Sequence, residues 1–355
     1  MIQRRQFLGA LTGCFAAGLA AGPVANRLLG NNKTDDLRWR CNVIQTVAHN
    51  RSLKKPVVTG VCLQPQGDLL AIVGDDHHVS LYDTVKQSYV EHLEAHTDWV
   101  RSTKFTQDGK TLITAGNDRT IYLWDTASID VPRMSREHEA AVIEVAISDD
   151  DQLFATVGFE ETLRVYDVRT GQVQREFRCP CKDNHAVAFS PGNKLIAAGG
   201  RSGTLSVWDL ASGKSVVKIK NHRKRIRSIR FTPDSKVISA GDDQIVCITD
   251  TQVPDRFVAM PRHASKLYAT ELLDAGMFAT AGSDNKIHVW QLSDLSEVGT
   301  LSGHTGTVSA LDFANHRLVS GSYDTQVRIW HTQSTTSILE HRSTQATEGW
   351  NQRLN

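Results

Sequence analysis

The chain has 355 residues, of which 40% are apolar and 22% charged, the balance of a soluble globular protein. Its formal net charge of +1 excludes a global field that recruits nucleic acid or an anionic membrane. Six cysteines in this length do not form a disulfide framework, and the close pair Cys179-Pro-Cys181 lacks the ligand count of a closed metal site, so we predict no metal and no cofactor.

The first thirty residues differ in composition from the rest of the chain. Arg4-Arg5 and Phe7-Leu8 are followed by small and apolar residues to about Gly22, with no acidic residue. This segment resembles a bacterial twin-arginine export signal, which implies an exported protein, periplasmic or membrane-anchored through residues 1–30. The apolar stretch is too short and too rich in glycine for a convincing membrane span.

The fate of this segment stays open at the level of the sequence. The positions before Pro23 and Asn26 are poor cleavage sites, so the segment could be retained as an anchor, and the residues ending at Cys14 resemble a lipoprotein box. The alternative is the N-terminal tail of a cytoplasmic protein. We expect residues 31–40 to be a linker to the next region.

From residue 41 the chain is repetitive. Seven similar strand endings follow one another at intervals of 40 to 42 residues: LYD (81–83), LWD (123–125), VYD (165–167), VWD (207–209), ITD (248–250), VWQ (289–291) and IWH (329–331). Histidines open most of the units: His49, His96, His138, His222, His263 and His304. A fixed period of this length is typical of repeat architectures.

The second unit shows how each repeat should fold. Alternating apolar runs separated by polar turns predict strands at Val100–Phe105, Leu112–Ala115 and Ile121–Trp124, followed by a fourth, more polar strand. A four-stranded antiparallel sheet cannot bury both faces alone, but radially packed copies can. The seven units therefore predict an all-β, seven-bladed propeller of four-stranded blades.

These repeats resemble the WD40-repeat family, and the resemblance covers seven in-register units over residues 49–331. We assign residues 41–341 to one monomeric propeller and residues 342–355 to a polar tail. Two strands compete to close the ring, Asn42–Val47 and Thr335–Glu340. In the family the N-terminal strand usually completes the last blade, and we favour that solution.

The resemblance also assigns a role to histidine, a hydroxyl residue, aspartate and tryptophan. In WD40 repeats the indole N–H donates to the hydroxyl, the hydroxyl to one imidazole nitrogen, and the other ring N–H to the carboxylate, a relay inside the blade. Three units carry the full set: His96, Thr114, Asp118 and Trp124; His263, Thr280, Asp284 and Trp290; His304, Ser320, Asp324 and Trp330. A catalytic triad would occur once, so we predict no catalytic residue.

The other units are incomplete. Unit 3 has Glu160 and Tyr166 in place of aspartate and tryptophan, and unit 5 has Thr249 in place of tryptophan. Unit 1 lacks the hydroxyl, and unit 4 lacks the set, with Ser202 at the aspartate position. His185 in unit 4 is out of register, and we interpret it as an ordinary strand residue. Blade 4 should be the least stabilised by such a relay.

Binding should fall to the loops, because the strands are used for packing. In the WD40 family the top-face contacts come from residues after the opening histidine and from the residue before the relay aspartate. On this chain the resemblance assigns partner binding to seven residues, with Asp75 and Asp242 as acidic neighbours: Trp99, Phe159, Tyr323, Arg201, Arg223, Arg225 and Lys266. Aromatic and arginine side chains are enriched at binding hot spots.

The leading hypothesis is a non-enzymatic scaffold that binds an acidic protein or peptide through this top face. No nucleic acid is expected, because the basic run at 221–231 has no interleaved aromatic residues that would stack on bases. The alternative is an exported propeller enzyme or ligand-binding protein with a site at the central channel. For that alternative the first strands offer only Glu144, Glu271 and Asp312, which we interpret as isolated, salt-bridged or solvated residues.

Overall fold

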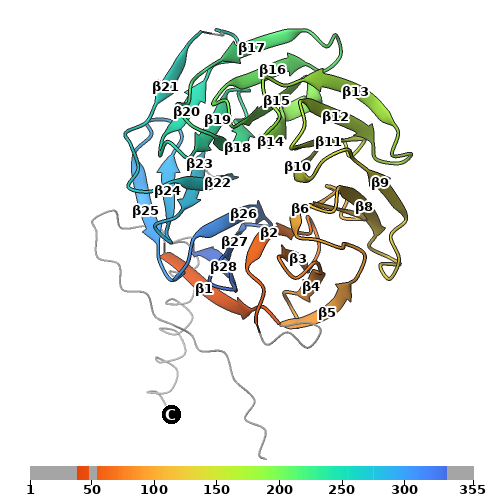
Figure 1. Cartoon of the computed structure of the whole chain (residues 1–355). Helices are drawn as coiled ribbons and strands as arrows, with labels where there is room; N and C mark the ends of the chain where they lie inside the picture. Colours follow the sequence, from red (N-terminus) through yellow and green to blue (C-terminus); the bar gives the residue numbers. More distant parts are fainter. Residues whose placement is uncertain (1–37, 48–53, 254, 275, 334–355) are drawn as a thin grey trace, which may run out of the picture.

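The computed structural model describes residues 38–47, 54–253, 255–274 and 276–333. In these ranges the strands form seven four-stranded antiparallel sheets, arranged as blades around a central axis (Figure 1). The predicted all-β, seven-bladed propeller is confirmed. The segments predicted as an export signal (1–30) and a polar tail (342–355) lie outside the described residues.

The first four blades follow one another along the chain, with the strands of each running from the inside outward. Blade 1 contains β2 (Val58–Leu63), β3 (Leu69–Gly74), β4 (Val79–Asp83) and β5 (Ser88–Leu93). Blade 2 contains β6 (Val100–Phe105), β7 (Thr111–Gly116), β8 (Thr120–Asp125) and β9 (Met134–Glu137). Blade 3 contains β10 (Val142–Ile147), β11 (Leu153–Gly158), β12 (Thr162–Asp167) and β13 (Val173–Arg178). Blade 4 contains β14 (Asn184–Phe189), β15 (Leu195–Gly200), β16 (Leu205–Asp209) and β17 (Ser215–Ile219), with the short 3-10 helix η1 (Pro191–Asn193) between β14 and β15.

The last three blades complete the ring. Blade 5 contains β18 (Ile226–Phe231), β19 (Val237–Gly241), β20 (Val246–Thr249) and β21 (Phe257–Ala259). Blade 6 contains β22 (Leu267–Leu273), β23 (Met277–Gly282), β24 (Ile287–Gln291) and β25 (Glu297–Leu301). Blade 7 contains β26 (Val308–Ala314), β27 (Arg317–Ser322), β28 (Gln326–Gln333) and β1 (Arg38–Gln45).

The N-terminal strand closes the ring. β1 pairs antiparallel with β28 along its whole length, from Arg38 opposite Gln333 to Gln45 opposite Gln326 (Figure 1). The favoured closure is confirmed, and β1 begins three residues inside the segment assigned as a linker. Joining strands that are far apart in sequence leaves no open end between the first and last blades.

Packing between blades explains why the second strand of each blade is almost entirely buried. In β3, β7 and β11 every residue after the first is buried, because a neighbouring blade covers each face of the sheet. The buried apolar residues form seven clusters, and each cluster joins two adjacent blades. The last of these interfaces, between blades 7 and 1, includes Ile44 of β1.

Each inner strand begins with a β-bulge. The pairing register shifts between the first and third residue, as between Val100 and Ser102 in β6, so the residue between them has no partner in the ladder. A bulge redirects the side chain of its extra residue. We call the seven residues at this position the bulge ring: Thr59, Arg101, Ile143, His185, Arg227, Tyr268 and Ser309.

Candidate functional site

One end of the propeller is formed by the turns between the second and third strands together with the loops that enter each blade. In six blades the first backbone N–H of the turn donates to a carbonyl of the entering loop over 2.8–3.0 Å: Asn117 to Trp99, Phe159 to Ala141, Arg201 to Asp183, Asp242 to Arg225, Ser283 to Lys266 and Tyr323 to Thr307. These bonds hold the two sets of residues together at one end of the ring, which we call the top face.

The three aromatic residues assigned to partner binding are exposed on this face. Trp99 is 37% exposed, Phe159 46% and Tyr323 42%. Such exposure is unusual for large aromatic side chains, which are highly buried on average. Phe159 and Tyr323 also line a cavity at the centre of the ring.

The four basic residues of the assigned set differ in their surroundings. Arg201, Arg223 and Lys266 are exposed and form no ion pair within the described ranges. Arg225 instead bridges blades 4 and 5, with Nη2 at 2.6 Å from Asp183 Oδ2 and Nη1 at 3.9 Å from Asp242 Oδ2. Only 25% of its side chain is exposed, so its charge is largely compensated within the chain.

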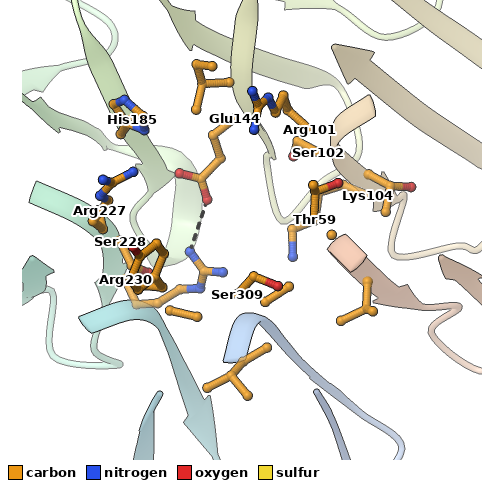
Figure 2. Close-up of a pocket in the computed structure, with 18 of the residues that line it drawn as sticks. Thr59, Arg101, Ser102, Lys104, Glu144, His185, Arg227, Ser228, Arg230 and Ser309 are labelled. Carbon is orange, nitrogen blue, oxygen red and sulfur yellow. Dashed lines mark ion pairs between the residues drawn. The ribbon is translucent and has the colours of Figure 1, made fainter. Parts of the chain in front are cut away.

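The bulge ring surrounds the central cavity, which has a volume of about 290 Å³. All seven of its side chains line this space, so the bulges direct one residue from every blade toward the axis. Figure 2 shows His185, Arg227 and Arg230 on one side of the cavity, facing Arg101 and Thr59 on the other. Sequence reasoning missed this ring and treated His185 as an ordinary strand residue. The signal was available, because the ring position is the second residue of every inner strand.

An ionic layer lies next to the bulge ring. Lys104 Nζ is 2.8 Å from Asp312 Oδ1, joining blades 2 and 7. Arg230 Nη1 is 3.5 Å from Glu144 Oε1 (Figure 2), and its Nη2 is 3.0 Å from Glu271 Oε2, so Arg230 joins blades 5, 3 and 6. Burial raises the pKa of Glu144 to about 7, although Arg230 and Lys104 act in the opposite direction.

The prediction for these three carboxylates is therefore half right. Glu144, Glu271 and Asp312 are salt-bridged, as expected, but they are not isolated. Asp312 Oδ2 also accepts the backbone N–H of Leu63 at 2.8 Å, and Glu144 Oε2 accepts that of Val187 at 3.2 Å. They converge because the inner strands of all blades surround one axis, which a single strand does not reveal.

Blades 2 and 7 contain a continuous relay. In blade 2, His96 Nδ1 lies 2.8 Å from Asp118 Oδ2, His96 Nε2 lies 2.9 Å from Thr114 Oγ1, and the Trp124 indole N–H donates to the same hydroxyl over 3.0 Å. Because a carboxylate only accepts, Nδ1 carries the proton and Nε2 accepts from the hydroxyl.

Blade 7 repeats this arrangement. His304 contacts Asp324 at 2.9 Å and Ser320 at 2.8 Å, and the Trp330 indole N–H donates to Ser320 over 2.9 Å. Burial alone would raise the pKa of Asp324, yet hydrogen bonds from His304 and from the Thr305 backbone lower it to about 2.

Blade 6 differs from the expected relay. The Trp290 indole donates to Thr280 over 2.9 Å, but Asp284 Oδ2 lies 3.0 Å from His288 Nε2 rather than against His263. His288 displaces His263 because it stands four residues after Asp284 on β24 and reaches the carboxylate locally. His263 Nε2 is buried without a hydrogen-bond partner among the described residues, and its ring packs against Trp290 with centroids 5.0 Å apart.

Two blades without tryptophan form the network with substitutes, of which the sequence analysis named Glu160 and Tyr166 but not Asn221. In blade 3 the Tyr166 hydroxyl contacts His138 Nε2 directly at 2.7 Å, while His138 Nδ1 lies 2.9 Å from Glu160. In blade 5 the amide of Asn221 donates to both Ser239 and Thr249, at 3.2 and 3.1 Å, in the place of the indole. A polar donor directly before the histidine is the sequence signal for the second case.

Blade 4 has a link of another kind. The Asn184 amide donates to the carbonyls of Glu160 and Cys181, both at 2.8 Å, and so ties blade 4 to blade 3. Ser202, at the aspartate position, accepts the backbone N–H of Thr204, at 3.1 Å.

The described ranges also bear on metal binding and membrane insertion. No group of three or more His, Cys, Asp and Glu side chains is placed there to bind a metal ion. No helix in those ranges has the length and hydropathy of a membrane span.

Comparison with known families gives a match over most of the ring. Residues 46–304 match the model of the Nucleolar protein 10-like, N-terminal domain, a β-propeller. The chain belongs to this family. Residues 295–331 also match the WD domain, G-beta repeat, so the resemblance to WD40 repeats is confirmed.

Similar curated proteins match over shorter segments. Autophagic-related protein 16.2 of Caenorhabditis elegans is 34% identical over 93 residues, 24% of this chain and 17% of that protein. A U3 snoRNP-associated protein-like protein of Arabidopsis thaliana is 35% identical over 80 residues, 22% of this chain and 17% of that protein. Periodic tryptophan protein 2 of the same plant is 41% identical over 59 residues, 16% of this chain and 7% of that protein. The matches thus span 17% or less of these relatives.

These matches correct the predicted location. The family is named for a nucleolar protein and one relative for association with the U3 snoRNP, which contradicts an exported, periplasmic or membrane-anchored protein. The prediction rested on residues 1–30, which lie outside the described residues. Paired arginines before a short apolar run are a weak signal, because the pattern is brief and of low complexity.

Proposed function

We propose that this propeller is a non-enzymatic scaffold that binds a protein or peptide partner on its top face. The observation that carries the proposal is the gathering of three exposed aromatic residues, Trp99, Phe159 and Tyr323, on the face that also bears the cavity. Rigid aromatic side chains bury a large area at low entropic cost, which makes them typical anchors of protein interfaces.

Charge favours a partner with acidic residues. Arg201, Arg223 and Lys266 are exposed on the same face, whereas the acidic Asp183 and Asp242 are engaged by Arg225. Uncompensated positive charge at the rim of an interface speeds the encounter with an oppositely charged surface. The acidic neighbours also disfavour a nucleic acid, whose phosphates would meet these carboxylates.

The alternative of an enzyme at the central channel has weaker support. The carboxylates and cations of the ionic layer are paired with one another, which leaves Glu144 and Glu271 without freedom to act on a substrate. The relay residues form hydrogen bonds inside the blades, and His96 and Asp118 are almost fully buried.

The test compares two faces of the propeller. Trp99→Ala should weaken capture of the natural partner roughly thirty-fold, because loss of an aromatic anchor costs about 2 kcal/mol. Glu176→Ala, on the outer strand β13, serves as the control. If the Glu176 variant loses more binding than the Trp99 variant in a titration by calorimetry, the sides of the propeller carry the interaction and the proposal is wrong.

A further inference from the structure

Two arginines of the bulge ring are held in the same way in blades 2 and 5. The Arg101 guanidinium lies over the Trp99 ring at 4.6 Å, and that of Arg227 lies over the Tyr268 ring at 5.0 Å. Each Nε also donates to the first residue of its own top-face turn, Arg101 to Asn117 at 2.8 Å and Arg227 to Asp242 at 2.9 Å. Stacking and the Nε bond fix the orientation of both groups at the cavity.

The two cations act on each other across the cavity mouth. The pKa of Arg101 is lowered chiefly by burial and also by the charge of Arg227, while Tyr323 and Asp98 act in the opposite direction. Arg227 is paired with Asp242, but Arg101 forms no ion pair among the described residues. Two like charges lining one partly buried space are stabilised by an anion between them.

His185 also lines the cavity, and a carboxylate holds its ring. His185 Nε2 lies 2.8 Å from Asp183 Oδ1. Burial lowers the pKa of His185 to about 4, so the ring is neutral near pH 7 and adds no charge to the cavity. The positive charge that an anion meets at the mouth therefore comes from the arginines.

We propose that the channel mouth is an oxyanion site, which binds a carboxylate or phosphate carried by one side chain of the partner between Arg101 and Arg227. The inference rests on the proposed function, since it names the group by which the partner is recognised. The guanidinium groups provide paired N–H donors that suit both oxyanions.

The depth and size of the site limit what it accepts. Its volume of about 290 Å³ is at the low end for small-molecule pockets, so a side chain fits better than a free cofactor. Glu144 lines the cavity below the mouth, and its carboxylate disfavours a deeper anion. Asp98, Asp183 and Asp242 flank the mouth, which favours one oxyanion over the continuous phosphates of RNA.

Three short fluorescent peptides, identical except at two positions, test whether the full-length protein binds an oxyanion at this site. One carries two glutamates, the second two phosphoserines at the same positions, and the third two glutamines. In fluorescence anisotropy the glutamine peptide should bind at least about ten-fold more weakly than the better anionic peptide. The two anionic peptides decide between carboxylate and phosphate. Equal binding of all three, or no saturable binding of an anionic peptide at millimolar concentration, would overturn the proposal.

Substitutions of single arginines test whether the anionic peptides bind at the channel mouth. Arg101→Gln and Arg227→Gln should each weaken the anionic peptide by about ten-fold or more, whereas Arg178→Gln, whose side chain is 86% exposed on β13, should not. Arg101→Lys keeps the charge but loses the paired donors, so it should bind with intermediate affinity even if Arg101→Gln folds poorly. Wild-type affinity in both arginine variants would overturn the assignment.

RNA binding at this site and failure of the proposed function would each give a distinct result. A single-stranded RNA that binds more tightly than both anionic peptides, and that also depends on Arg101, would overturn the peptide assignment. If instead the proposed function is wrong, the natural partner would be insensitive to Trp99→Ala, while the anionic peptides would still require Arg101 and Arg227.

Discussion

At the scale of single residues, the relay is a matter of local geometry rather than of residue type. Blades 2 and 7 connect histidine to aspartate, whereas blade 6 has the same four residue types and connects Asp284 to His288. Blade 5 lacks tryptophan and supplies an equivalent donor from Asn221. The presence of the four residues in a unit is therefore neither sufficient nor necessary for a linked histidine, hydroxyl and carboxylate.

Removal of the relay carboxylate in blade 7 should be costly. Asp324→Ala leaves His304 Nδ1 and the Thr305 N–H without their acceptor, at a site where the Asp324 side chain is 4% exposed. We expect a loss of about 1–3 kcal/mol in the free energy of unfolding, measured by urea titration. Ser202→Ala in blade 4 should change it by less than about 0.5 kcal/mol. Equal losses of stability at the two sites would show that the repeats have been aligned in the wrong register.

His263 should contribute to acid sensitivity. Burial lowers its pKa to about 4, helped by the charge of His288, while Asp284 and Glu297 act in the opposite direction. The unfolded chain binds a proton near pH 6.5, so stability is fully present above that pH and falls as the pH drops toward 4. His263→Phe should reduce this loss and leave stability at pH 7.5 nearly unchanged, whereas His96→Phe should destabilise at both pH values. Parallel melting curves at pH 5 and 7.5 compare them, and an unaltered pH dependence in the His263 variant would contradict the prediction.

At the scale of elements, each strand presents its two sides to different environments. The middle strands are covered on both faces, whereas burial varies along the closing strand β1, in which Ile44 is 5% and Val43 42% exposed. Trp39 and Cys41, on the same side of β1 as Val43, pack partly against the cluster between blades 6 and 7. The ladder between β1 and β28 joins the two ends of the ring, and Ile44 packs into the interface between blades 7 and 1. Closure thus combines backbone pairing with burial.

These adjacent residues provide a matched test of closure. Ile44→Asp should lower the melting temperature by several degrees, because an unpaired carboxylate replaces an apolar side chain of the core. Val43→Asp should change it little, since that side chain is 42% exposed. Scanning calorimetry compares the two variants, and the prediction is wrong if Val43→Asp is the more damaging.

At the scale of the whole molecule, the near-zero net charge conceals an uneven distribution. The exposed basic residues Arg201, Arg223 and Lys266 come from blades 4, 5 and 6, while the exposed aromatic residues come from blades 2, 3 and 7. The top face therefore has a basic half and an aromatic half around one cavity. Charge and aromatic contacts should affect different steps of binding.

Charge reversal should slow the encounter with the partner. The double variant Arg201→Glu and Arg223→Glu should lower the association rate about ten-fold at low salt and abolish much of its salt dependence, because rim charges act mainly through steering. The dissociation rate should change much less, in contrast to Trp99→Ala. Surface plasmon resonance over a range of salt concentrations measures both rates. A double variant that changes only the dissociation rate would show that these charges form specific contacts instead.

The repeat period, the alternation of apolar residues and the opening histidines were enough to predict seven four-stranded blades, because contacts within a blade join residues close in sequence. The N-terminal closure came from resemblance to WD40 repeats. The convergence of Arg101, His185 and Arg227 at one cavity, and of Glu144 with Arg230, required the tertiary structure. These residues lie on different blades, about one to three repeats apart, and only the closed ring with its bulges brings them together. The repeat pattern also did not predict that His288, which is close to Asp284 in sequence, would contact this carboxylate in place of His263.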